Sequence, residues 1–281
     1  MELLDYLLRF IEEDAPYGDL TSSAIIPDIT CDAVIRAEQG GTIAGLDEAA
    51  LLFSHYGVSV KQRIADGTTV CKNDVLLSLK GDAKKILLIE RTALNIIGRM
   101  SGIATQTRKL SGIASSVNPR CRIAATRKTC PGFQVLDKKA VKIGGGDPHR
   151  MNLSDGILIK DNHLALVPLD IAISAAKKSS VYKKIEVEAE TTENALIAAR
   201  AGADIIMLDN MSPAQINRTI KVLEREGLRE RVIIELSGGI DESSLARYAE
   251  LDVDVISLGV LTHSVRNFPV NLEIISQIAR K

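Results

Sequence analysis

Residues 204–215 read DIIMLDNMSPAQ, and this stretch shows the pattern that decides the fold. Four apolar residues in a row are typical of a strand buried in a sheet, and the polar Asp209 follows them directly. Ser212 then begins a helix as its N-cap, Pro213 takes the first helical position, and Gln215 completes a capping box. The stretch therefore predicts one β-strand followed by one α-helix.

The same pattern recurs along the second half of the chain. Six short β-rich runs each precede a helical stretch, and they occupy residues 122–126, 156–159, 185–188, 204–208, 232–236 and 253–258. The later runs start 19 to 28 residues apart, the length of one βα unit. Repeated βα units predict a parallel sheet, and no GxGxxG motif follows the first run, which disfavours a Rossmann fold. We therefore expect an α/β barrel of the TIM type, complete or with fewer strands.

The first part of the chain has a different pattern. A helix candidate at residues 3–11 and strand-like runs at residues 33–37 and 75–79 predict a small α+β domain. Residues 82–118 predict a long helix, broken near Gly102, with one apolar face. We expect three parts: an N-terminal domain at residues 1–105, a barrel domain at residues 106–268, and a C-terminal helix at residues 269–281 that packs back on the N-terminal domain.

The composition is that of a globular protein and excludes several classes of function. Hydrophobic residues make up 46% of the 281 residues and charged residues 25%, which is enough for a packed core. A net charge of −1, an aromatic content of 3% and the absence of Trp argue against binding to nucleic acid or to membranes. No apolar run reaches the length of a membrane span, and the acidic start does not resemble a signal peptide. The four cysteines form no CxxC pair, so we expect free thiols in a cytoplasmic protein.

Polar or glycine residues follow every predicted strand of the barrel. In barrels of this type the working residues lie at the carboxyl ends of the strands. Those positions hold Arg127, Lys128, Lys160, Glu188, Asp209, Ser237, Gly238, Gly239 and Gly259. Loops are polar in most proteins, but six such strand ends in succession predict one shared site.

The segment between residues 120 and 163 is strongly cationic. It holds nine Lys or Arg against four Asp, although the whole chain has a net charge of −1. We expect the lysines of a short helix in this segment to form a solvated face, namely Lys138, Lys139 and Lys142. A binding role is expected for the cations near strand ends and near the glycine run 144–146, namely Arg127, Lys128, His149, Arg150 and Lys160. Because arginine and lysine bind carboxylates and phosphates, the predicted ligand is polyanionic.

Two acidic residues and two glycine-containing turns complete the predicted site. Glu188 and Asp209 offer hard oxygen ligands for Mg²⁺ or acceptors for sugar hydroxyls; alternatively, each pairs with a nearby Lys or Arg. The turns Ser237–Gly239 and Gly259 follow the last two strands, where barrel enzymes commonly bind phosphate on backbone N–H groups. No Ser or Cys is placed beside a histidine in a way that suggests a nucleophile. We interpret His163 either as structural or as a residue that supports neighbouring site residues.

Longer motifs follow one another in order along the chain. They are YGDLTS at residues 17–22, ERTALNIIGRMSGIAT at 90–105, TRKTCPG at 126–132, GGGDPHR at 144–150, ILIKDNH at 157–163, IMLDN at 206–210, ELSGGI at 235–240 and LGVLTHS at 258–264. Together they resemble the quinolinate phosphoribosyltransferase family, the carboxylating nicotinate-nucleotide diphosphorylases of NAD biosynthesis. The resemblance spans nearly the whole chain.

This resemblance implies both an architecture and a reaction. The architecture is an open α/β sandwich followed by an α/β barrel, in dimers or dimer-based hexamers whose active sites are shared between subunits. Arg91 would reach the site of the neighbouring subunit. The reaction transfers a phosphoribosyl group from phosphoribosyl pyrophosphate (PRPP) to quinolinate, with loss of pyrophosphate and CO₂ and with Mg²⁺ as cofactor.

The resemblance also implies roles for individual residues. Quinolinate and PRPP would be held by Arg127, Lys128, His149, Arg150 and Lys160. Glu188 and Asp209 would bind the ribose and Mg²⁺-pyrophosphate. The 5′-phosphate would be bound by Ser237, Gly238, Gly239 and Gly259. The catalytic set would be Lys128, Lys160, Glu188 and Asp209.

Other hypotheses remain open at this point. Lys160 at a strand end can form a Schiff base, as in an aldolase-like lyase, and a barrel of this kind can bind phosphate without catalysis. Nicotinate is a rival acceptor, because its single carboxylate needs fewer cations. A molybdenum-associated homologue shares the fold and some motifs, but the KDNH motif at residues 160–163 and the LDN motif at residues 208–210 favour the transferase.

Overall fold

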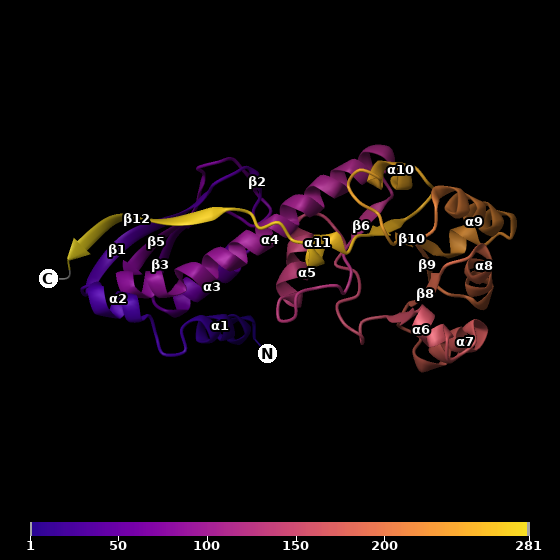
Figure 1. Ribbon diagram of the computed structural model, residues 1–281, viewed down its shortest axis with the longest axis horizontal. Helices are drawn as coiled ribbons and strands as arrows, with labels where there is room; N and C mark the ends of the chain where they lie inside the picture. The colour runs from indigo at the N-terminus through magenta and orange to yellow at the C-terminus, as the bar shows by residue number, and fades with distance from the viewer. Residues whose placement is uncertain (1, 280–281) are drawn as a thin grey trace. The chain divides into compact units, whose positions relative to one another are not determined.

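A computed structural model describes residues 2–279, with the side chains of residue 62 and residues 277–279 excepted. The chain divides into two compact units, Met1–Gln106 with Val265–Lys281, and Thr107–Ser264. Helix α4, Ala83–Val117, begins in the first unit and ends in the second (Figure 1). None of the described helices is long and apolar enough to cross a membrane.

The first unit is built on a four-stranded antiparallel sheet in the order β12-β1-β5-β3 (Figure 1). Its core includes Ile35 of β1, Leu77 of β5 and Phe53 of α3, all fully buried. The strands are β1 Ile29–Ala37, β3 Ser59–Arg63, β5 Val75–Asp82 and β12 Val270–Ala279, with a short pair β2 Gly41–Thr42 and β4 Thr69–Val70. The helices that precede α4 are α1 Leu3–Asp14, α2 Leu20–Ile25 and α3 Leu46–His55.

The C-terminal segment is a strand, so the predicted helix at residues 269–281 is wrong. β12 pairs antiparallel with β1, and Ile274 lies opposite Ala33. The edge of β1 offers a row of backbone N–H and C=O groups, and a segment rich in β-branched residues satisfies them by adding a strand. The segment packs against the N-terminal domain as expected, but through a sheet rather than a helix.

Helix α4 is continuous through Gly102, so the predicted break is wrong as well. Gly98 and Gly102 lie one turn apart, and residues 266–268 cross the helix at these glycines. A Cβ on Gly102 would stand 2.2 Å from the carbonyl oxygen of Arg266, and the N–H of Phe268 donates to the carbonyl of Gly98 at 2.8 Å. The glycines therefore make room for a crossing segment of backbone, which is a packing function rather than a helix stop.

The second unit confirms the predicted parallel α/β barrel. Among the described residues it has six strands in the order β6-β11-β10-β9-β8-β7, so β6 and β7 are the two edges. Figure 1 shows β8, β9 and β10 beside the helices α8 and α9. An isolated parallel bridge joins Ala124 of β6 to Asp147. The strands are β6 Arg122–Ala124, β7 Ile157–Ile159, β8 Ile185–Ala189, β9 Ile205–Asp209, β10 Ile233–Ser237 and β11 Val255–Ser257.

Helices connect these strands, and α8 packs on both α7 and α9. The N-terminus of α9 has the predicted capping box, in which the Ser212 side chain accepts from the N–H of Gln215 and the Gln215 side chain accepts from the N–H of Ser212. The helices are α5 Gln134–Ile143, α6 Asp161–Leu164, α7 Leu169–Ser179, α8 Thr192–Ala201, α9 Pro213–Arg225, α10 Leu245–Ala249 and α11 Val260–His263, with a 3-10 turn at Arg229–Arg231.

Candidate functional site

Most of the predicted site residues line one cavity of about 510 Å³ at the carboxyl ends of the barrel strands. Ten of the twelve predicted residues are in its lining, namely Arg127, Lys128, His149, Arg150, Lys160, Glu188, Asp209, Ser237, Gly238 and Gly239. Side chains alternate across each strand, so every second residue faces the barrel interior. The pairing register then sets Glu188 opposite Met207, Met207 opposite Glu235, and Asp209 opposite Ser237.

Two of the cations at the cavity, Lys128 and Arg150, are held in place by hydrogen bonds. Lys128 is exposed, but its N–H donates to Thr126 Oγ1 at 3.1 Å and its carbonyl accepts from Thr262 Oγ1 at 2.8 Å. The half-buried Arg150 donates from Nη1 to the carbonyl of Gly156 at 3.2 Å. Arg127 is exposed at the cavity. Fixed cations of this kind suit carboxylate and phosphate groups.

Lys160 and Glu188 form an ion pair within the cavity, with Nζ and Oε2 2.6 Å apart. The Glu188 side chain is only 10% exposed, so the pair is partly shielded from water. The predicted alternative, in which Glu188 pairs with a neighbouring cation, is thus present in the structure. His163 accepts from the backbone N–H of Lys160 through Nδ1 at 2.9 Å, so it holds the backbone of a cavity residue.

The loops after β9 and β10 are interlocked at a glycine. Gly238 has a φ of 91°, and a Cβ there would lie 2.3 Å from Asn210 Oδ1. Asn210 itself has a φ of 53°, and its N–H donates to the carbonyl of Ser237 at 3.0 Å. Its side-chain amide also donates to Asp209 Oδ2 at 2.6 Å. Asn210 was missed as a site residue, although an Asn directly after a strand is a known signal for left-handed backbone.

The two remaining predicted residues lie outside this lining. A Cβ on Gly259 would stand 3.3 Å from Lys128 Cδ, so this glycine lies beside the cavity's lysine. Arg91 lies exposed on α4 in the first unit. Its reach into the site of a neighbouring subunit therefore stays a prediction.

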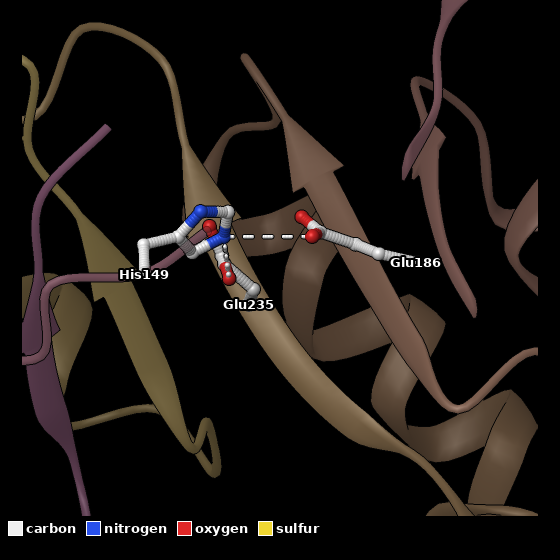
Figure 2. A group of neighbouring side chains, drawn as sticks. All are labelled: His149, Glu186 and Glu235. Atoms are coloured by element: carbon white, nitrogen blue, oxygen red, sulfur yellow. Dashed lines mark ion pairs between the residues drawn. The ribbon is translucent and has the colours of Figure 1, made fainter. Parts of the chain in front are cut away.

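Inside the barrel, His149 lies between two buried glutamates that were not predicted as site residues (Figure 2). Its Nε2 is 3.4 Å from Glu186 Oε2 and 3.3 Å from Glu235 Oε2. Burial alone would lower the pKa of His149, but hydrogen bonds to both carboxylates and their negative charge outweigh it and raise the pKa to about 10. Burial raises the pKa of Glu186, and the hydrogen bond from His149 opposes this. Glu235 interrupts the apolar run at residues 232–236, whereas Glu186 lies in an alternating run with Glu188 that does not distinguish it from a solvated residue.

Lys138 is buried, so its predicted place on a solvated face is wrong. It is 1% exposed, and its Nζ donates to the carbonyls of Pro148 and Arg150 on either side of His149. Burial lowers the pKa of Lys138 to about 8. Lys142 is exposed as expected, and Lys139 is half-buried. The helical period alone did not show that residues 148–150 fold back over α5.

The barrel has a second cavity of about 470 Å³, which lies toward the amino ends of the strands. His149, Arg150 and Glu235 line both cavities, and Glu186 lines the second. The fold and the site together are those of a barrel enzyme with a cationic cavity at the carboxyl ends of its strands.

Comparison with known protein families identifies the family of this chain. The model of the quinolinate phosphoribosyl transferase C-terminal domain matches residues 103–273, and that of the N-terminal domain matches residues 19–101. The chain belongs to the quinolinate phosphoribosyl transferase family.

Relatives in other organisms span the whole chain. It is 43% identical to the probable carboxylating nicotinate-nucleotide pyrophosphorylase of Methanothermobacter thermautotrophicus, over 97% of this chain and 99% of the relative. The carboxylating nicotinate-nucleotide pyrophosphorylase of Rattus norvegicus is 32% identical over 95% of this chain and 89% of its own length. The crystal structure of NadC from Streptococcus pyogenes superposes with a TM-score of 0.89, at 34% identity, over 98% of this chain and 96% of that one.

Proposed function

We propose that this protein transfers the phosphoribosyl group of PRPP to quinolinate and releases pyrophosphate, CO₂ and nicotinate mononucleotide. The observation that carries the proposal is the cavity at the carboxyl ends of the strands. It gathers five cationic or protonated groups, three carboxylates and a glycine turn from strands far apart in the sequence. Such a cavity suits two polyanionic substrates, which would otherwise repel each other.

In this proposal the quinolinate carboxylates bind to the cationic side of the cavity. Arg127, Arg150, Lys160 and His149 supply the charges, and arginine forks hold carboxylates with a defined orientation. Binding by several fixed cations sets the pyridine nitrogen against the anomeric carbon of the donor. Lys128 lies beside Gly259, where it would contact the phosphate-bearing donor.

The donor binds on the opposite side, at the turns after β10 and β11. The 5′-phosphate would accept hydrogen bonds from backbone N–H groups of Ser237–Gly239 and from the turn at Gly259. Glu188 and Asp209 would bind the ribose hydroxyls and Mg²⁺. Both line the cavity with carboxylate oxygens, the ligand type that Mg²⁺ prefers, so the residues present fit the ion. Bound Mg²⁺ would offset the negative charge of the pyrophosphate leaving group.

The chemistry then follows from charge on the substrates. The pyridine nitrogen replaces pyrophosphate at the anomeric carbon and becomes cationic. That positive charge stabilises the electron pair left on the adjacent ring carbon when its carboxylate departs as CO₂. That carbon then takes a proton from water, which replaces the lost carboxylate. The residues of this chain bind and orient the substrates and neutralise their charge, so the loss of CO₂ itself needs no dedicated acid or base.

We also propose a shared assembly and a cytoplasmic location. In a dimer, or in a hexamer built from dimers, Arg91 of one subunit would complete the anion site of the next, since its side chain is exposed. The cysteines support a reducing compartment, because Cys31, Cys71, Cys121 and Cys130 are all free thiols.

A coupled assay tests the proposed function. Quinolinate and nicotinate are offered separately with PRPP and Mg²⁺, and nicotinate mononucleotide and CO₂ are measured. We expect one CO₂ per nucleotide with quinolinate and little product with nicotinate. Turnover with nicotinate alone, or tight PRPP binding with no turnover, would contradict the proposal. Borohydride trapping on Lys160 would indicate a lyase, which its ion pair with Glu188 disfavours because an ammonium is not a nucleophile.

A further inference from the structure

The cluster of His149, Glu186 and Glu235 places three ionisable groups inside the barrel (Figure 2). Glu186 is 5% exposed and Glu235 is 2% exposed, while the His149 side chain is 14% exposed. The cluster draws on three separate places in the chain: β8, β10 and the segment before β7. Two buried carboxylates this close together are costly unless a cation neutralises part of their charge.

His149 is the group that contacts both carboxylates. Its Nε2 points between them (Figure 2), so Nε2 must carry a proton to donate to either one. This leaves two states for the ring. In the neutral state Nδ1 carries a lone pair and repels an anion, whereas in the imidazolium state Nδ1–H is a donor. The two carboxylates favour the imidazolium.

The backbone around His149 fixes the ring at this position. His149 has a φ of 56°, which is uncommon for a residue other than glycine, and its N–H donates to Asp147 Oδ1 at 2.8 Å. The buried Lys138 binds the carbonyls on both sides of it. Strained backbone that persists in this way is a recognised feature of functional sites.

The other charged groups around the ring come from the neighbouring elements. Arg122 of β6 forms an ion pair with Asp147 at 3.5 Å, and Arg150 follows His149 directly. Glu188 of β8 is paired with Lys160, and Asp209 of β9 with the amide of Asn210. These anions therefore have partners of their own, while both glutamates of the cluster have an oxygen, Oε1, with no hydrogen-bond partner in the described structure.

We propose that Glu186 and Glu235 are positioning residues that hold His149 as an imidazolium with Nε2 between them, so that its Nδ1–H donates to a carboxylate of the pyridine substrate. The proposal rests on the proposed function for the identity of that substrate. In this arrangement the two glutamates contact neither substrate. They set the charge and the orientation of the His149 ring, which contacts the pyridine substrate.

The first test is an NMR titration of the unmodified protein. The chain has four histidines, so the His149 ring signal is assigned by its loss in His149→Gln. We expect the ring to remain protonated at pH 8 and both ring nitrogens to show imidazolium shifts. A ring that is neutral at pH 7.5 would overturn the proposal, even if every glutamate variant failed to fold. A divalent metal ion bound to the cluster through Nε2 would also overturn the proposal, because a metal-bound nitrogen carries no proton.

The second test uses Glu186→Gln and Glu235→Gln, which keep the shape of the side chain and remove its charge. Each should lower the titration midpoint of His149 by about 1–3 pH units, since one nearby opposite charge is lost. The KM for quinolinate should then rise at pH 8.5, by up to about tenfold where the shift leaves His149 mostly neutral, as expected when a charge-assisted hydrogen bond is lost. It should return toward the wild-type value at pH 6. The KM for PRPP should change little.

The exposed Glu224→Gln on α9 is the matched control and should behave as wild type at both pH values. A defect in the cluster variants that is equal at pH 6 and pH 8.5, or equal for both substrates, would indicate a merely structural role and overturn the proposal. A protein that does not turn over quinolinate at all would instead refute the proposed function, while the NMR titration would still decide the charge of His149.

Discussion

Arg150 lines both cavities of the barrel, and the exposed Arg127 lines the cavity at the carboxyl ends of the strands. We predict that Arg150→Ala and Arg127→Ala each raise the KM for quinolinate. Each variant should lower kcat/KM by a factor that corresponds to about 2–5 kcal/mol, as when one partner of a desolvated charge pair is removed. Steady-state kinetics with quinolinate varied measure this. Lys142→Ala, on an exposed lysine of α5, is the control, and unchanged kinetics in both arginine variants would refute the carboxylate site.

Gly238 offers a second prediction at the level of one residue. Gly238→Ala would place a methyl group 2.3 Å from Asn210 Oδ1 and hold an alanine at a φ of 91°. Gly227, with a φ of 66° and nothing within 4 Å, is the matched control, because Gly227→Ala carries the backbone strain alone. We expect about 1–2 kcal/mol of lost stability in the control and a larger loss in Gly238→Ala, together with a higher KM for PRPP. Urea unfolding and kinetics measure the two effects, and equal losses would show that the loops are not interlocked.

At the scale of elements, α5 and the segment that follows it act as one structure, because the buried Lys138 of α5 binds carbonyls of residues 148 and 150. Its pKa is lowered to about 8 by burial, below the ordinary value of 10.5. Below pH 8 the folded protein must carry a buried ammonium. Between about pH 8 and 10.5 folding releases a proton, so this group makes stability rise with pH.

The prediction is that the free energy of unfolding of wild type, relative to Lys138→Met, increases between pH 7 and pH 9.5. Denaturant unfolding at both pH values measures it, and taking the difference cancels groups that titrate alike in the two proteins. Lys142→Met is the control and should show no such trend, because that lysine is exposed. A difference that stays constant with pH would mean that Lys138 keeps its charge throughout.

Helix α4 and strand β12 are the two elements that the sequence analysis predicted wrongly, the first as a broken helix and the second as a helix. The sequence shows Gly102 as a possible break, but not that residues 266–268 cross the helix there. In the same way, the last segment could be read as a helix because nothing local records the open edge of β1. Both errors come from contacts between residues more than 150 positions apart.

At the scale of the whole molecule, the proposed sharing of the active site between subunits predicts complementation between two inactive variants. Arg91→Ala and Lys128→Ala subunits are each expected to be inactive as pure oligomers. When they are mixed and allowed to exchange, a mixed dimer has one site with both changes and one site with neither. Random exchange of equal amounts should therefore restore about a quarter of the wild-type activity. Activity of the mixture is compared with that of each variant alone, and no recovery after proven subunit exchange would contradict the shared site.

The sequence by itself determined the order of the βα units, the helix cap at Ser212 and ten residues that line the cavity at the carboxyl ends of the strands. These features follow from local periodicity and from the rule that parallel strands end at one edge. Only the tertiary structure decided which charges are buried and paired. The local sequence did not lead us to predict the burial of Glu186, Glu235 and Lys138. The groups that pair with these side chains lie in other segments of the chain. The cost of burying a charge depends on those partners and on excluded water, and neither is encoded in any short stretch of the chain.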